Sequence, residues 1–256
     1  MIELNYVRAG PNGWVCQRNR MQYMKHDSDE RVVLGKASGK YKTLINTLPK
    51  KYFRCEIPSW MRVIRDSERL SSLVKRSKYN PDIIVAIGRG GFIPSRILCD
   101  YLLLKDMATI KVEHWGVAKP KKKAVIRFPL CADIKAKRVL LVDDITDTGE
   151  TLRVSFEYLK GFGPKEIRTA VLVHKATSRF QPDYYVRKII KWRWVIFPWH
   201  IREDITSFIE GLKNEGIRSW QDIRSELKSR YCMSIRSKLI KEILSELEAD
   251  AFHHDA

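Results

Sequence analysis

Residues 138–152 read RVLLVDDITDTGETL. Val139–Val142 is a short apolar run with β-branched residues, which is typical of a central parallel strand covered on both faces. The adjacent carboxylates Asp143–Asp144 follow at the strand end, where open α/β sheets bind their ligands. Thr146–Thr151 then offers hydroxyls and backbone N–H groups at a helix start, and Gly149 permits close backbone approach. The segment predicts a site for a phosphate group next to hydroxyls or a metal ion.

A second segment has the same plan, a buried strand followed by a small turn and a helix. The apolar run Ile83–Ile87 leads into Gly88-Arg89-Gly90-Gly91, and we expect a helix from about Phe92 to Leu104. Glycines allow successive N–H groups to converge on an anion, and the arginine adds a delocalised positive charge. The segment at residues 138–152 contains neither the glycine pattern of a dinucleotide-binding turn nor that of a P-loop.

Together the two segments closely resemble the signature of type I phosphoribosyltransferases, which bind phosphoribosyl pyrophosphate (PRPP). An apolar strand, Asp-Asp, two residues, Asp-Thr-Gly, one residue and Thr follow the family pattern without a gap. The resemblance covers about residues 60–204. It implies a magnesium-dependent reaction in which a nucleobase displaces pyrophosphate from C1 of the ribose, giving a nucleoside monophosphate.

The resemblance also implies roles for individual residues. Asp143 and Asp144 would face the ribose hydroxyls and hold Mg²⁺, and Asp147 would lie near the base as the general acid/base. Carboxylates suit a reaction in which carbocation character develops at C1. The implied phosphate-binding residues are Arg89, Gly90 and Gly91 for pyrophosphate, Thr148, Gly149, Glu150 and Thr151 for the 5′-phosphate, and Thr146 as a further substrate-binding residue.

Two later segments bear on the choice of base. In 6-oxopurine phosphoribosyltransferases, especially the xanthine–guanine type, a lysine at a strand end meets the exocyclic oxygen, and an aromatic residue shortly before Pro-Trp stacks on the purine. Lys175 and Trp194 occupy these places. A lysine donor suits a carbonyl at position six and would repel the amino group of adenine. Trp192 competes with Trp194 for the stacking role, and Ile196 would offer a backbone group to the base edge.

The chain departs from the family pattern at two places. Glu113-His114-Trp115 stands near the basic loop Gly116–Lys123, where the family has a Ser-Tyr pair and a mobile flap over the reacting centre. His200 follows the Pro-Trp pair in place of the usual acidic residue, with Glu203 and Asp204 close behind. Either carboxylate is a candidate to replace it near Mg²⁺, since this hard cation prefers oxygen ligands.

Composition limits the class of protein. With 256 residues and 44% hydrophobic content, the chain is long enough for one good-sized domain and an appendage. The net charge of +18 indicates phosphorylated substrates, nucleic acid or a merely solvated basic surface. The five scattered cysteines predict free thiols in a reducing cytosol. No apolar run approaches a membrane span, so we expect a cytoplasmic protein with no membrane partner.

Alternating strands and helices predict an α/β fold with a parallel sheet flanked by helices. Further strands are expected at 109–115, 124–129 and 167–174, with helices at 59–78 and 150–159. We divide the chain into a basic N-terminal extension (1–55), a phosphoribosyltransferase domain (56–204) and a helical C-terminal appendage (205–256). In the appendage, apolar spacing from Ile205, a capping box at Ser219–Asp222 and a last run from Ile235 to Leu247 predict three helices.

The sequence leaves two functions to weigh. The first is purine salvage, converting hypoxanthine, guanine or xanthine to its monophosphate, with orotate or adenine as the other bases the same loop accommodates. The second is a PRPP-sensing regulator that binds nucleic acid through the last two helices as a helix-turn-helix, because residues 213–241 carry eight basic and three acidic residues. We favour the enzyme, with the appendage as a helical cap or dimer contact. The family resemblance further implies a homo-oligomer, a dimer or a tetramer.

Overall fold

The computed structural model describes residues 6–8, 14–16, 52–115 and 123–252. The chain divides into two compact units, Met1–Ala37 and Ser38–Ala256. In the first unit the described residues form an antiparallel pair of β1 (Tyr6–Arg8) and β2 (Trp14–Cys16). The second unit holds every other described element. These are β3 (Cys55–Glu56), α2 (Trp60–Arg76), β4 (Ile83–Gly88), α3 (Phe92–Leu102), β5 (Met107–Trp115), β6 (Lys123–Phe128), β7 (Arg138–Thr146), α4 (Glu150–Lys160), β8 (Glu166–Lys175), β9 (Tyr184–Ile189), β10 (Trp194–Val195), α5 (Ile201–Asn214), α6 (Trp220–Tyr231) and α7 (Ser237–Phe252).

The second unit is built on a six-stranded sheet in the order β6-β5-β4-β7-β8-β9. All neighbouring strands are parallel except β5 and β6, which are antiparallel. Strands β4 and β7 lie side by side in the middle, with Ala86 opposite Val142, and β8 follows β7 with His174 opposite Thr146. The carboxyl ends of β4, β7 and β8 therefore meet at one edge of the sheet.

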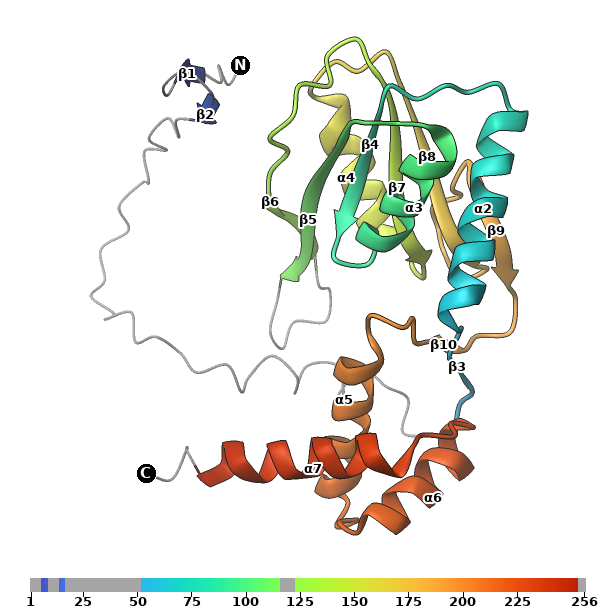
Figure 1. The fold of residues 1–256 in the computed structure, drawn as a ribbon, viewed down its shortest axis with the longest axis vertical. Coiled ribbons are helices and arrows are strands. Elements are labelled where there is room, and N and C mark those ends of the chain that lie inside the picture. The colour runs from blue at the N-terminus through green and yellow to red at the C-terminus, as the bar shows by residue number, and fades with distance from the viewer. Residues whose placement is uncertain (1–5, 9–13, 17–51, 116–122, 253–256) are drawn as a thin grey trace. The chain divides into compact units, whose positions relative to one another are not determined.

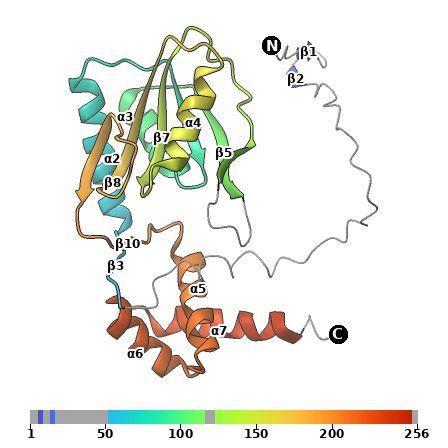
Figure 2. The same ribbon diagram turned by 180° about the vertical axis from the view of Figure 1, so that it is seen from behind.

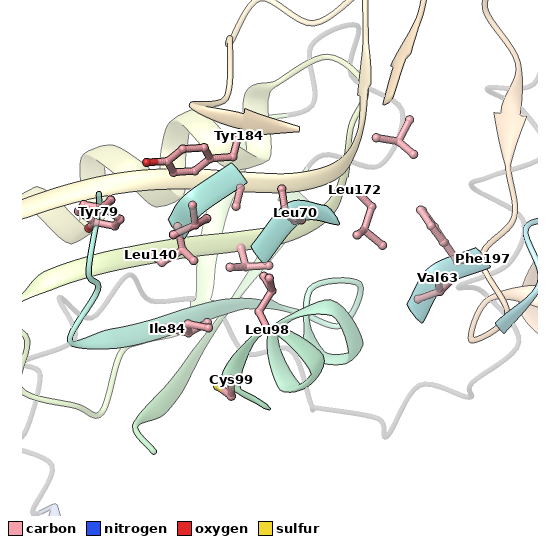
Figure 3. Close-up of a cluster of buried hydrophobic side chains, with 14 of the residues drawn as sticks. Val63, Leu70, Tyr79, Ile84, Leu98, Cys99, Leu140, Leu172, Tyr184 and Phe197 are labelled. Carbon is pink, nitrogen blue, oxygen red and sulfur yellow. The ribbon is translucent and has the colours of Figure 1, made fainter. Parts of the chain in front are cut away.

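Helices cover both faces of this sheet (Figures 1 and 2). Along β7, Leu140 and Val142 belong to a core cluster with side chains of α2 and α3, whereas Val139 and Leu141 belong to a cluster with α4. This alternation follows from the two-residue period of a strand. Figure 3 shows the first cluster, in which Leu70 of α2 and Leu98 of α3 lie over the sheet. The expected α/β sheet flanked by helices is confirmed.

Several element bounds differ from the expectations. Helix α5 begins at Ile201, directly after a turn at residues 198–200 and four residues before the periodic apolar run at Ile205. Strand β9 was not predicted, since Tyr184–Ile189 mixes polar and aromatic residues at the sheet edge. A separate parallel pair of β3 and β10 was also not predicted, because each strand has only two residues.

The C-terminal helices α5, α6 and α7 share a third core cluster with β3 and with Ile196 after β10. Ser219 caps α6 by accepting a hydrogen bond from the backbone N–H of Asp222 at 3.1 Å, as the capping box predicts. Cys232 ends α6 in the left-handed conformation, with φ of 57°. Through this shared core, the C-terminal helices adjoin the strand that carries Trp194. None of the described helices is long and apolar enough to span a membrane.

Candidate functional site

Three predicted site segments lie at the carboxyl ends of three adjacent parallel strands. The glycine turn follows β4, the Asp143–Asp144 pair lies just before the end of β7 at Thr146, and Lys175 ends β8. In an open α/β sheet this edge is where ligands bind. The basic loop 116–122, expected to act as a flap, lies outside the described residues.

The turn after β4 has glycines where side chains would collide with the neighbouring strand. A Cβ at Gly90 would stand 2.5 Å from an oxygen of Asp144, and one at Gly91 would stand 2.4 Å from the carbonyl oxygen of Val142. The Gly88–Arg89 peptide bond is cis. The glycines therefore let the turn after β4 lie directly against the acidic pair, so two of the predicted ligand-binding segments form one site.

The acidic pair is buried, and its electrostatics are unusual. Asp143 and Asp144 are 8% and 5% exposed, and Oδ1 of Asp143 accepts the backbone N–H of Asp144 at 2.9 Å. Burial, and then the charge of Asp144, raise the pKa of Asp143 well above its usual range. Trp199 donates its indole N–H to Oδ2 of Asp144 at 3.1 Å. A cation or ribose hydroxyls at this place would offset the repulsion between the two carboxylates.

The start of α4 presents backbone N–H groups. Gly149 is the N-cap residue, has φ of 83° and brings no side chain to cap the helix. A Cβ there would lie 2.5 Å from the hydroxyl of Ser178 and 2.7 Å from the backbone nitrogen of Phe180. The helix dipole and the N–H groups of this first turn suit an anion. The remaining predicted loop residues stand around this turn, namely the buried Thr146, and Thr148, Glu150 and Thr151.

Lys175 and Asp147 form an ion pair, although they are 28 positions apart. Nζ of Lys175 lies 2.6 Å from Oδ2 of Asp147, and the lysine side chain is only 3% exposed. Thr177 donates its hydroxyl to the backbone carbonyl of Asp147 at 3.0 Å and contacts Oδ1 at 3.3 Å. The structure thus brings the expected base-reading lysine to the expected general acid/base.

Both candidate stacking residues stand at this lysine. Nζ of Lys175 lies 4.8 Å from the ring centre of Trp192 and 5.8 Å from that of Trp194. The two indole rings are 6.2 Å apart and tilted by 55°. Ile196 donates its backbone N–H to the carbonyl of Glu56 at 2.9 Å. A backbone contact from Ile196 to a base would therefore have to come from its carbonyl group.

The structure adds a contact that sequence reasoning missed. Nη2 of Arg89 donates to both carboxylate oxygens of Glu203, at 2.9 and 2.7 Å. This joins the glycine turn to the first turn of α5, where His200 lies 3.6 Å from Asp144. Burial alone lowers the pKa of His200, but nearby carboxylates, Asp144 foremost, outweigh it and raise the pKa above its usual value. Only the acidic residues after Pro-Trp signalled this contact in the sequence.

A family model described as "Phosphoribosyl transferase domain" matches residues 55–205. The chain belongs to this family. The matched residues of this phosphoribosyl transferase include the glycine turn, the acidic pair, Lys175 and Trp194, but neither α6 nor α7.

Similar proteins lie within the same family. This phosphoribosyl transferase is 32% identical over 147 residues to a xanthine-guanine phosphoribosyltransferase of Gluconobacter oxydans, covering 55% of this chain and 82% of the relative. It is 29% identical over 149 residues to one of Cereibacter sphaeroides, covering 55% and 84%. A crystal structure of a purine phosphoribosyltransferase from Pyrococcus horikoshii aligns with a TM-score of 0.52 and 38% identity, over 57% of this chain and 93% of that one.

The donor set of this phosphoribosyl transferase fits magnesium. The carboxylate of Asp144 lies beside Gly90 at the turn after β4, next to that of Asp143, and Glu203 contacts Arg89 of the same turn. No group of three or more His, Cys, Asp or Glu residues that could hold a metal gathers in the part of the chain that the structure describes. Mg²⁺ is commonly bound by one or two carboxylates together with substrate phosphates and water, so the two carboxylates suffice.

Proposed function

We propose that this phosphoribosyltransferase transfers 5-phosphoribose from PRPP to a 6-oxopurine (hypoxanthine, guanine or xanthine), with Mg²⁺, and releases pyrophosphate. The contact of Lys175 with Asp147 carries the proposal. The 6-oxygen and N7 are adjacent acceptors on one edge of a 6-oxopurine. An ammonium and a carboxylate 2.6 Å apart match that edge, with the ammonium donating to the oxygen and Asp147 exchanging a proton at N7.

The relatives agree with this choice of substrate. Two of them are named xanthine-guanine phosphoribosyltransferases, and the aligned structure is of a purine phosphoribosyltransferase. The expectation of a PRPP-sensing regulator receives no support from these names. Lys175 and the two tryptophans also favour the enzyme, because a sensor of PRPP needs no residue that distinguishes one base from another.

The remaining residues have separate tasks in the proposed reaction. The N–H groups at the start of α4 bind the 5′-phosphate, and the turn from Arg89 to Gly91 binds pyrophosphate. Asp143 and Asp144 fix the ribose hydroxyls and hold Mg²⁺, which when bound offsets the charge of the phosphates. The ring of Trp194 covers a face of the purine. These contacts hold the base nitrogen in line with C1, so that positioning lowers the barrier.

Three further expectations stay predictions. These are the division at residues 55 and 204, assembly into a dimer or tetramer, and residence in the cytoplasm.

The test is pyrophosphate release from PRPP and Mg²⁺ with hypoxanthine, guanine, xanthine, adenine or orotate. We expect turnover with at least one 6-oxopurine, reduced about 10²- to 10⁴-fold in Asp147→Ala. Turnover with adenine or orotate alone would contradict the assignment of the base while leaving the donor site intact. Absence of turnover with all five bases would contradict the proposed enzymatic activity.

A further inference from the structure

Trp192 makes a contact that stacking on a base does not explain. Its ring centre lies 4.8 Å from the Lys175 ammonium, closer than the ring centre of Trp194 at 5.8 Å. An ammonium over an indole face is attracted by the ring quadrupole, and the attraction grows when water is excluded. At 3% exposure, the Lys175 side chain has almost no water to replace this contact.

The ring of Trp192 packs in turn against a second aromatic side chain, that of Phe53. Its ring meets Phe53 edge to face, with centres 5.5 Å apart and an angle of 68°. Phe53 in turn lies 4.9 Å from the ring of Tyr231 at the end of α6 and 6.0 Å from that of Phe208 in α5. The backbone N–H of Phe53 donates to the carbonyl of Arg230 at 3.1 Å. An aromatic chain therefore connects α6, which lies outside the family match, to the lysine.

We propose that Trp192 is a positioning residue that holds the Lys175 ammonium at the 6-oxygen of the bound purine, and that Phe53 and Tyr231 keep its ring in place. The proposal rests on the proposed function. It also assigns a task to the C-terminal helices, which is to support the base-reading lysine.

The contact matters because Lys175 has two competing partners. Without a base, its ammonium pairs with Asp147 at 2.6 Å. The 6-oxygen of a purine competes with that carboxylate for the N–H donors of the ammonium, and a less tightly paired Asp147 is freer to exchange a proton at N7. The same Nζ atom that pairs with Asp147 also lies 4.8 Å from the centre of the Trp192 ring, so both contacts are made at one position of the ammonium. Attraction to the ring keeps the ammonium at that position when the purine oxygen replaces Asp147 as its partner. Loss of the ring removes the contact that keeps the ammonium in place for the 6-oxygen, so the purine binds less tightly.

Direct stacking of Trp192 on the purine is the rival explanation, and a double-mutant cycle separates the two. A residue that acts through Lys175 has no effect once the lysine is gone, whereas a residue that stacks on the base keeps its effect. The variants are W192L, W192F, K175M and the double variant K175M/W192L. I190A is the matched control, since Ile190 is an exposed apolar residue of the same loop.

Four quantities are measured on the full chain: the KM for hypoxanthine, the KM for PRPP, the Kd for inosine monophosphate by calorimetry, and the melting temperature. We expect W192L to raise the hypoxanthine KM and the nucleotide Kd about tenfold. The KM for PRPP and the melting temperature should stay near wild type. W192F keeps a ring and should recover most of the loss, and I190A should match wild type. In K175M, adding W192L should change the nucleotide Kd less than twofold.

The proposal is overturned if W192L weakens nucleotide binding equally with and without Lys175, or if W192L changes the KM of both substrates alike. Failure of the proposed function looks different, because wild type itself would then show no turnover with hypoxanthine. Y231L and Y231F test the outer part of the chain. Y231L should raise the hypoxanthine KM about threefold at an unchanged PRPP KM, and Y231F should not. An unchanged hypoxanthine KM in Y231L would overturn the role of α6.

Discussion

The ammonium of Lys175, almost fully buried, lies 2.6 Å from the carboxylate of Asp147, which is more exposed at 39%. The lysine comes from the end of β8 and the aspartate from the loop after β7, so the parallel pairing of the two strands sets their distance. A base that enters here meets a cationic donor and a carboxylate at once. The first prediction follows from this arrangement.

Replacing Lys175 by methionine should remove the preference for 6-oxopurines. The variant keeps an apolar stem but loses the donor, so hypoxanthine kcat/KM should fall about a hundredfold, the usual worth of a hydrogen bond to a charged group. Adenine kcat/KM should not fall, because its amino group no longer meets a cation. Parallel steady-state assays with both bases check this. Equal losses for the two bases would mean that Lys175 does not read position six.

Gly149→Ala should weaken PRPP binding. The residue has φ of 83°, and a Cβ would stand 2.5 Å from the Ser178 hydroxyl and 2.7 Å from Phe180, so the first turn of α4 must shift. We expect a higher KM for PRPP and a loss of about 1–3 kcal/mol in unfolding free energy. Gly216→Ala is the matched control, because Gly216 has φ of 90° but nothing within 4 Å of a Cβ. Gly216→Ala should cost stability alone. A normal PRPP KM in Gly149→Ala would contradict the assigned phosphate site.

Glu203, rather than Asp204, should be the carboxylate that assists magnesium. Glu203 accepts a hydrogen bond from Arg89 of the glycine turn, whereas burial raises the pKa of Asp204 to about 6 and so disfavours its ionised form. Glu203→Gln should therefore raise the Mg²⁺ concentration for half-maximal rate about tenfold. The Arg89 side chain of this ion pair is 63% exposed, so its loss should change the melting temperature little. Magnesium titrations of Glu203→Gln and Asp204→Asn show which carboxylate assists magnesium. A larger rise of the half-maximal Mg²⁺ concentration in Asp204→Asn would assign that role to Asp204.

Asp204→Asn should instead change stability with pH. Burial, opposed in part by the charge of His200, raises the pKa of Asp204 to about 6. The protonated form thus favours folding, and its contribution is complete below the unfolded pKa and lost as pH rises through about 6. Asparagine mimics that form, so the variant should be more stable by about 2–3 kcal/mol at pH 8 and nearly unchanged at pH 3. Urea unfolding at the two pH values measures this. An equal gain at both pH values would exclude the ionised Asp204 as its cause.

The strands that carry the site could be predicted because they are buried on both faces. Ile83–Ile87 and Val139–Val142 are continuous apolar runs, and each is followed by its polar or glycine-rich turn. Strand β9 escaped prediction because an edge strand need not be apolar on both faces. The contacts of Arg89 with Glu203 and of Lys175 with Trp192 also escaped. Both join distant segments through the parallel sheet and the β3–β10 pair, and no local period reports such pairing.

The most direct test of the central claim is kcat/KM for hypoxanthine and for adenine, measured side by side with saturating PRPP and Mg²⁺. A lysine that donates to position six predicts at least about a hundredfold preference for hypoxanthine, with inosine monophosphate as the product. An equal or higher kcat/KM for adenine would contradict the account.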